Sequence, residues 1–128
     1  MNEQELLTQL DCLGLHTQEA LERFMGNQAL FLSFVRQLPE KMNFTRIRQQ
    51  LEAEDEENFY MNIHNLKGLS GNLSIEPIHE CTEAILAEFR TSQFKNKKKL
   101  RALLQEAEIT SQALSELIGR YTAEEEQK

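Results

Sequence analysis

Residues 64–73 read His-Asn-Leu-Lys-Gly-Leu-Ser-Gly-Asn-Leu, and this segment indicates what kind of fold to expect. A helix turns about 100° per residue, so the apolar side chains of residues 59–73 gather on one side, which we expect to face the core. These side chains are Phe59, Ile63, Leu66, Leu69 and Leu73. His64 points the opposite way, and we expect its imidazole to reach solvent.

Two glycines, Gly68 and Gly71, share the outward side of this predicted helix with His64, Tyr60 and Lys67. A glycine inside a helix costs about 1 kcal/mol relative to alanine, so two of them beside one exposed histidine require a reason. A partner that approaches the imidazole closely supplies one. The sequence therefore predicts a contact surface around His64.

The pattern His64-x-Leu66-Lys67-Gly68-x-Ser70-Gly71-Asn72-Leu73 resembles the signature of histidine-containing phosphotransfer (HPt) domains, which relay phosphoryl groups between receiver domains in bacterial two-component phosphorelays. Two positions depart from the family pattern. Leu69 stands where a small residue is usual, and Ser74 stands where the family usually has glycine. Neither departure removes a reacting group. The resemblance extends more loosely over residues 15–118.

The resemblance implies a role for each residue on the outward side. His64 would accept a phosphoryl group from one receiver aspartate and pass it to another, and Lys67 would offset the charge of that group. The receiver would dock on a surface formed by Tyr60, Gly68, Gly71 and Asn72. The expected partners are receiver domains of response regulators or hybrid sensor kinases. The chain would need no cofactor or metal ion of its own, because Mg²⁺ is expected on the partner receiver.

The segments before His64 carry helical patterns of their own. Leucines at positions 6, 7, 10 and 13 predict a short amphipathic helix ending at Gly14, and Thr17 is placed to cap a second one ending at Gly26. A long apolar pattern follows Asn27 and continues across Pro39. We interpret it as one kinked helix of about 25 residues rather than two helices.

The helices around and after the His64 segment have recognisable ends. Asp55 is the expected cap of the helix that carries His64, and Ser74 of the next helix, with Pro77 in its first turn. A last helix with leucines at positions 100, 103, 104, 114 and 117 is expected to end at Gly119.

Together, the pattern and the resemblance predict an all-α protein, an antiparallel four-helix bundle with short accessory N-terminal helices. We divide it into an accessory helix at residues 1–14, the HPt bundle at 15–120 and an acidic, disordered tail at 121–128. The starting Met and the self-contained length slightly favour a free-standing protein over a domain of a hybrid kinase.

Composition narrows the function further. A formal net charge of −7 argues against nucleic acid as the main partner. No apolar run approaches the roughly 18 residues of a membrane-spanning helix, so we expect a soluble protein without membrane insertion. We also expect it to be cytoplasmic, and a monomer because nothing in the sequence requires a dimer. Cys12 and Cys81 lie far apart without a CxxC motif, and we expect both to be reduced and mostly buried.

Two other clusters of charged or metal-binding residue types are interpreted without a functional site. His79, Glu80 and Cys81, with Glu83 nearby, could hold a metal ion by residue type, but adjacent residues diverge by about 100° around a helix, so we expect no metal site there. The basic cluster from Lys95 to Arg101 is interpreted as a solvated charge run, with docking of an acidic partner surface as the alternative. It consists of Lys95, Lys97, Lys98, Lys99 and Arg101.

The sequence contains no serine or cysteine triad, phosphate-binding loop or nucleotide motif, so we expect a phosphocarrier without kinase activity. Two alternatives remain open. The chain could be a helical adaptor that binds receiver domains without phosphotransfer, or a metal-binding helical protein. The cognate kinase, the response regulator and the direction of phosphoryl flux are not encoded in any recognisable motif.

Overall fold

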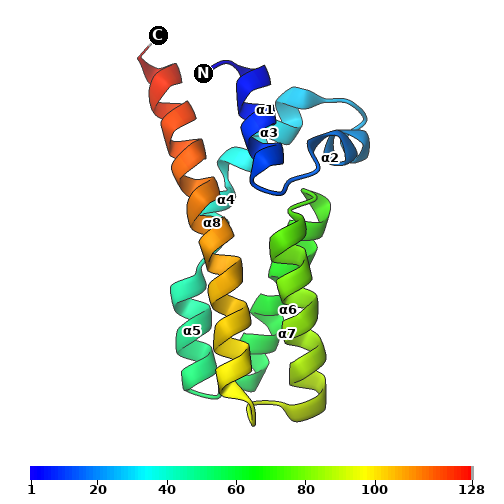
Figure 1. The fold of residues 1–128 in the computed structure, drawn as a ribbon, viewed down its shortest axis with the longest axis vertical. Coiled ribbons are helices and arrows are strands. Elements are labelled where there is room, and N and C mark those ends of the chain that lie inside the picture. The colour runs from blue at the N-terminus through cyan, green and yellow to red at the C-terminus, as the bar shows by residue number, and fades with distance from the viewer. Residues whose placement is uncertain (128) are drawn as a thin grey trace.

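The computed structural model describes residues 1–127, which fold into helices joined by short turns (Figure 1). The helices are α1 (Glu3–Cys12), α2 (Thr17–Arg23), α3 (Gln28–Arg36), α4 (Leu38–Lys41), α5 (Phe44–Glu52), α6 (Glu56–Asn72), α7 (Glu76–Ser92) and α8 (Lys97–Glu126). Within this range the only β-type pairing is an isolated bridge between Leu15 and Ile75. The all-α prediction is confirmed.

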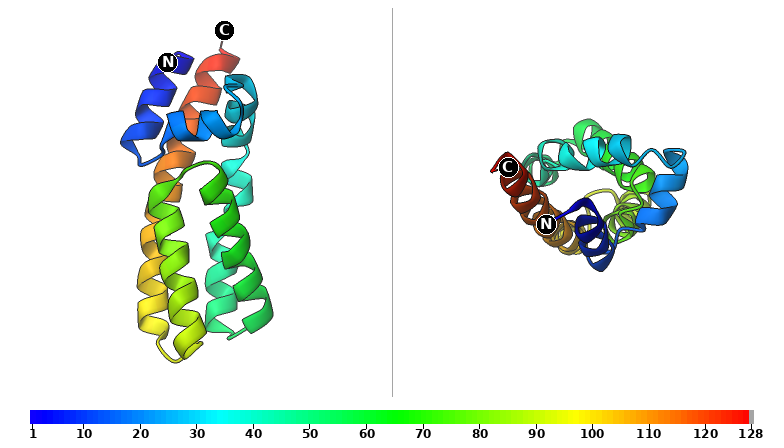
Figure 2. Two further views of the ribbon diagram at one scale, coloured as in Figure 1. Left: turned by 90° about the vertical axis from the view of Figure 1, so that its right-hand side faces the viewer. Right: turned by 90° about the horizontal axis from the view of Figure 1, so that it is seen from above.

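The molecule has two ends that share α8. At one end α5, α6, α7 and the first half of α8 lie lengthwise side by side, and α1 to α4 lie at the other end beside the second half of α8 (Figures 1 and 2). Helix α7 packs against α6 and α8, and α5 packs against the same two helices. These four segments therefore surround a common interior.

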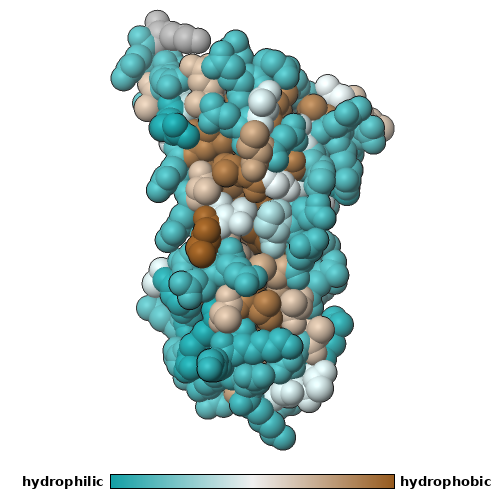
Figure 3. All heavy atoms as spheres, viewed as in Figure 1, coloured by the Kyte–Doolittle hydropathy of each residue, from teal (hydrophilic) through white to brown (hydrophobic). Residues whose placement is uncertain are grey.

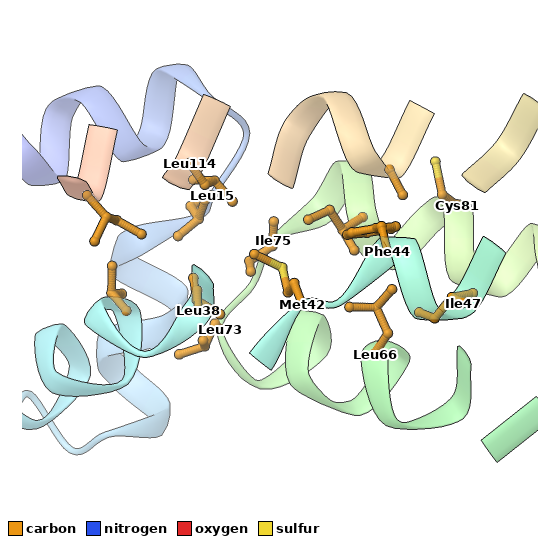
Figure 4. Packing of buried hydrophobic residues seen from close by; sticks show 14 of the residues in the cluster. Leu15, Leu38, Met42, Phe44, Ile47, Leu66, Leu73, Ile75, Cys81 and Leu114 are labelled. Carbon is orange, nitrogen blue, oxygen red and sulfur yellow. The ribbon is translucent and has the colours of Figure 1, made fainter. Parts of the chain in front are cut away.

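One apolar core runs through both ends. In Figure 4 its side chains continue from Leu15 and Leu114, past Met42, to Ile47 and Leu66. Leu6 and Leu10 of α1 belong to the same buried cluster. The N-terminal helices therefore extend the core in which α6 is embedded.

The segment after Asn27 is broken rather than kinked, so the prediction of one long helix is wrong. Met42 and Asn43 have ψ angles of 84° and 82°, outside the helical region, between α4 and α5. The side chain of Asn43 accepts a hydrogen bond from the Arg46 backbone N–H at 3.0 Å and so caps α5. Pro39 lies in the first turn of α4, where its missing N–H is harmless. The apolar pattern in the sequence is not interrupted at this break, because α5 buries its apolar face in the same core as α3 and α4.

Two predicted caps are also wrong. Thr17 lies inside α2, and the Asp11 carboxylate accepts hydrogen bonds from its backbone N–H and hydroxyl, each at 2.9 Å. Ser74 has a φ of 54° and precedes Ile75, which is the N-cap residue of α7 and forms no side-chain capping hydrogen bond. This left-handed conformation explains why glycine suits the position. Asp55 does cap α6, and Pro77 does lie in the first turn of α7, as predicted.

Helix α8 continues through Gly119 to Glu126, so the predicted end at Gly119 and the disordered tail are wrong as far as residue 126. Tyr121 is 2% exposed, and the Arg36 guanidinium lies 5.5 Å from its ring centre. Arg36 also forms an ion pair with Glu125 at 2.5 Å. Burial of this tyrosine offsets the cost of the glycine within the helix. Residue 128 of the predicted tail lies outside the described residues.

Among residues 1–127, no helix combines the length and apolar character needed to cross a bilayer. Figure 3 shows brown atoms mainly along the middle of one face, with hydrophilic atoms on both sides.

The two cysteines differ in environment. Cys81 is buried, and burial together with the nearby Glu106 raises the pKa of its thiol to about 11. Cys12 is exposed, which contradicts the predicted burial. Both are free thiols, as predicted.

Candidate functional site

Helix α6 is a well-anchored element of 17 residues. The Asp55 side chain accepts the Asn58 backbone N–H at 3.4 Å, and Glu56 and Glu57 in the first turn suit the positive end of the helix. Its core face is buried as predicted, except that Leu69 is only partly covered. Ser70, on the flank of that face, is fully buried as well. Its hydroxyl donates a hydrogen bond to the Lys67 carbonyl at 3.1 Å. The cap and the buried face together fix how α6 is placed, and so which of its side chains face solvent.

His64 lies on the solvent side of α6, as predicted. Among residues 1–127 its imidazole has no hydrogen bond or ion pair, and its nearest aromatic neighbour is Tyr60, with ring centres 6.1 Å apart at 32°. Tyr60 is 39% exposed and is itself supported by Phe89 of α7, at 6.2 Å between ring centres. Both ring nitrogens of His64 are therefore available to an incoming group.

Lys67 lies one turn after His64 and is half-buried. Its ammonium group forms no ion pair with any described residue. A lysine with a free positive charge beside a free imidazole is suited to balance the negative charge of a group attached to that imidazole.

The two glycines of the outward side have different surroundings. A Cβ added at Gly68 would have no neighbour within 4 Å, so the surface there is open. A Cβ at Gly71 would lie 3.3 Å from Cε1 and 3.4 Å from Nδ1 of His79, so α7 already fills that space. Only Gly68 leaves open surface beside His64. Asn72 is exposed at the end of α6.

His79 of α7 lies beside this surface, which the sequence did not predict. Its Nδ1 lies 3.3 Å from the Lys67 carbonyl oxygen, and its Nε2 lies 2.6 Å from a carboxylate oxygen of Glu83. The ring is half-buried and bridges α7 to the backbone of α6. No pattern on one helix reveals this contact, because it depends on how closely α6 and α7 pack.

The turn between α6 and α7 is held by the N-terminal segment. The His16 backbone N–H donates to the Ser74 carbonyl at 3.0 Å, and the Glu76 N–H donates to the Gly14 carbonyl at 3.2 Å. A Cβ at Gly14, whose φ is 101°, would lie 2.5 Å from the Pro77 ring, so this close approach requires glycine.

The same junction carries an exposed ion pair between His16 and Glu76. The hydrogen bond to Glu76 raises the pKa of His16, and the hydrogen bond from His16 lowers the pKa of Glu76. The pair joins the start of α2 to the first turn of α7. Arg23 adds a contact from α2 to the side chain of Ser74.

Most of the basic cluster is matched by acidic residues of the chain itself. Lys97 lies 3.4 Å from Glu54, Lys99 lies 3.1 Å from Glu88, and Arg101 makes two contacts to Glu52 at 2.5 and 2.8 Å. The Arg101 contact lowers the pKa of Glu52. Lys95 and Lys98 are exposed and have no ion pair within residues 1–127. Little unpaired positive charge is left for an acidic partner.

Two further observations bear on what the chain could bind. The part of the chain that the structure describes contains no group of three or more His, Cys, Asp or Glu side chains placed to hold a metal ion. Compared with known proteins, the chain matches no family model, no curated protein and no solved structure.

Proposed function

We propose that this chain is a histidine-containing phosphotransfer domain that relays a phosphoryl group between receiver-domain aspartates through phosphohistidine at His64. The observation that carries the proposal is the exposed imidazole of His64, without a polar partner among residues 1–127, on a helix whose opposite side is buried. The open surface at Gly68 and the free charge of Lys67 support it.

In this proposal α5, α6, α7 and α8 are the antiparallel four-helix bundle of the family, and α1 and α2 are accessory helices. The packing of α7 and α5 against the same two neighbours supports a closed bundle of these four. A rigid support of this kind suits a reaction that needs one side chain held in a fixed direction.

The chemistry requires little from this chain. A neutral imidazole has one ring nitrogen with a free lone pair, so that nitrogen can attack phosphorus without a base to remove a proton first. In the step we propose, the P–N bond to His64 forms while the P–O bond of the receiver's aspartyl phosphate breaks. The receiver carboxylate leaves with the electron pair. The reverse step returns the phosphoryl group to an aspartate of a second receiver.

The partner supplies the remaining groups. A receiver domain carries the aspartate and the Mg²⁺ that balances charge during in-line transfer. On this side a hollow lined by Tyr60, Met61 and Phe89 lies beside the N-terminal part of α6, and a second one lined by Asn65 and Leu69 lies along its other flank. A transient partner of this class would sit over His64 between the two hollows. The chain would act as a cytoplasmic monomer.

The proposal is tested by transfer of radiolabelled phosphate. Receiver domains from the genome that encodes the chain are phosphorylated, freed of donor and mixed with the wild type, His64→Gln and His16→Gln in the presence of Mg²⁺. We expect acid-labile, base-stable label on the wild type and on His16→Gln, and none on His64→Gln. His16→Gln is a matched control because it removes another exposed histidine.

The outcomes separate the alternatives. Label on His64→Gln equal to that on the wild type would exclude phosphohistidine at position 64. Binding of a receiver without any transfer of label would favour the helical adaptor, in which the surface around His64 binds receivers without chemistry. Circular dichroism of His64→Gln shows whether the fold survives, as the exposed position of His64 predicts.

A further inference from the structure

We propose that His79 of α7 is a docking residue for the receiver, and that position 71 is glycine because the His79 ring lies over it. This inference rests on the proposed function. The sequence predicted that Gly71 contacts the partner directly. In the structure Gly71 instead contacts His79 of the neighbouring helix α7. No residue of α7 entered the predicted docking surface.

The geometry gives His79 one fixed place. Its ring atoms would be 3.3 and 3.4 Å from a Cβ at position 71, which is closer than an ordinary carbon contact. Contacts at both ring nitrogens, to the Lys67 carbonyl and to Glu83, hold the ring on α6. Helices α6 and α7 lie side by side over this whole region (Figure 2).

A docked receiver would reach this ring. Gly71 follows His64 by seven residues, which is about 10 Å along a helix and close to two full turns, so both positions face the same way. An ordinary transient interface covers roughly 800 Å² per partner, a patch with a radius of about 16 Å. A partner centred on His64 therefore covers position 71 and meets the half-exposed imidazole of His79 there.

The test measures phosphotransfer kinetics from the receiver that transfers fastest to the wild type. We expect His79→Ala to raise the KM for the phosphorylated receiver about tenfold and to leave kcat unchanged, as for removal of one well-packed contact residue. His79→Gln, whose amide can still donate to the Lys67 carbonyl, should keep most of the affinity. Labelling of His64 by the small donor phosphoramidate, which needs no docking, should be the same in all variants.

Gly71→Ala provides the second arm. If the new methyl group acts by displacing His79, Gly71→Ala raises KM in the wild-type background and has no further effect in His79→Ala. For the same reason, Gly71→Ala should raise the urea midpoint of unfolding more in the His79→Ala background than in the wild type. This stability arm needs no receiver.

Each result decides a separate point. A KM for His79→Ala equal to that of the wild type overturns the docking role of His79. Additive effects of the two substitutions on the urea midpoint overturn the packing of His79 over Gly71. Failure of the wild type to accept phosphate from any receiver overturns the proposed function and the docking role with it, whereas the stability arm still reports on the packing.

Discussion

His64 combines a reactive group with very little local support. Among residues 1–127 its ring nitrogens have no partner, so a phosphoryl group added there displaces no existing interaction of the protein. What the surroundings supply is one positive charge at Lys67 and open surface at Gly68. The consequences of removing each can be measured separately.

Removal of the charge at position 67 should shorten the life of phosphohistidine. Lys67→Ala leaves the phosphoryl oxygens without a nearby cation, and we expect transfer and phosphohistidine lifetime to fall about three- to tenfold, as for loss of ~1 kcal/mol of charge-assisted contact. Lifetimes are measured by decay of acid-labile label. Lys98→Ala is the matched control, because Lys98 is also an exposed lysine without an ion pair in the described chain. Equal lifetimes in Lys67→Ala and Lys98→Ala would contradict the role of Lys67.

A bulky side chain at position 68 should block the receiver without harming the fold. Gly68→Gln places a long side chain in open space beside His64, and we expect transfer from a receiver to fall more than tenfold while labelling by phosphoramidate continues. Stability should rise by up to about 1 kcal/mol, because glycine is a poor helix former. Gly119→Gln is the control, since Gly119 is a helical glycine with equally open surroundings on α8. Normal receiver transfer by Gly68→Gln would show that the partner docks elsewhere.

Among the elements, α5 depends on a cap that lies inside an apolar pattern. Asn43→Ala removes the side-chain acceptor for the Arg46 N–H, and we expect the free energy of unfolding to fall by about 1 kcal/mol. Asn43→Asp keeps an acceptor at the same place and should retain most of the stability. Urea denaturation followed by circular dichroism measures both. Equal stability of the alanine and aspartate variants would mean that packing alone ends the helix at this point.

The helices whose signals are local could be predicted from the sequence, and the others could not. Asp55 caps the helix that directly follows it, and the solvent position of His64 follows from the period of that helix. Asp11 caps a helix that begins six residues later, across a turn, so no local pattern contains both groups. The end of α8 was missed because burial of Tyr121 by other helices outweighs the local preference of Gly119.

The same distinction applies to the candidate site. Tyr60, His64, Lys67 and Gly68 belong to one helix, and the helical period placed all four on the outward or partly outward side. The filling of Gly71 by His79 joins two helices and depends on their separation. A single helical period contains no information about that separation, so this half of the surface required the three-dimensional structure.

For the whole molecule, the ion pair between α2 and α7 makes stability depend on pH. His16 binds its proton more tightly in the folded state than its ordinary value of 6.5 indicates, so its contribution is complete below that value and is lost as the pH rises through the raised one. The lowered pKa of Glu76 gives a contribution that is present above its ordinary value of 4.5 and is lost on acidification. The pair therefore stabilises the fold between these limits.

The measurement is the difference in unfolding free energy between the wild type and His16→Gln. We expect the difference to be largest between the ordinary pKa values of Glu76 and His16, 4.5 and 6.5, and to disappear once the pH has passed the raised pKa of His16, because the imidazole is then neutral in both states. Salt at 1 M should reduce it, since both side chains are exposed. A difference that stays constant from pH 5 to pH 9 would show that the contact acts through packing and not through charge.

The N-terminal amine forms an ion pair with Glu124, so Met1 and the last turns of α8 lie together at one end of the molecule (Figure 1). Because of this proximity, the order in which the helices are connected can be changed while their packing is kept. A circular permutant that joins residue 127 to Met1 through a short flexible linker, and opens the chain between Gln93 and Asn96, should keep α6 and α7 in contact and show the same phosphotransfer at His64 that we propose for the wild type. Such a permutant would present both new termini at the far end of the molecule, next to the turn between α7 and α8. Fluorescent labels could then be attached at these new termini, away from the end of the molecule where α1 and the last turns of α8 lie.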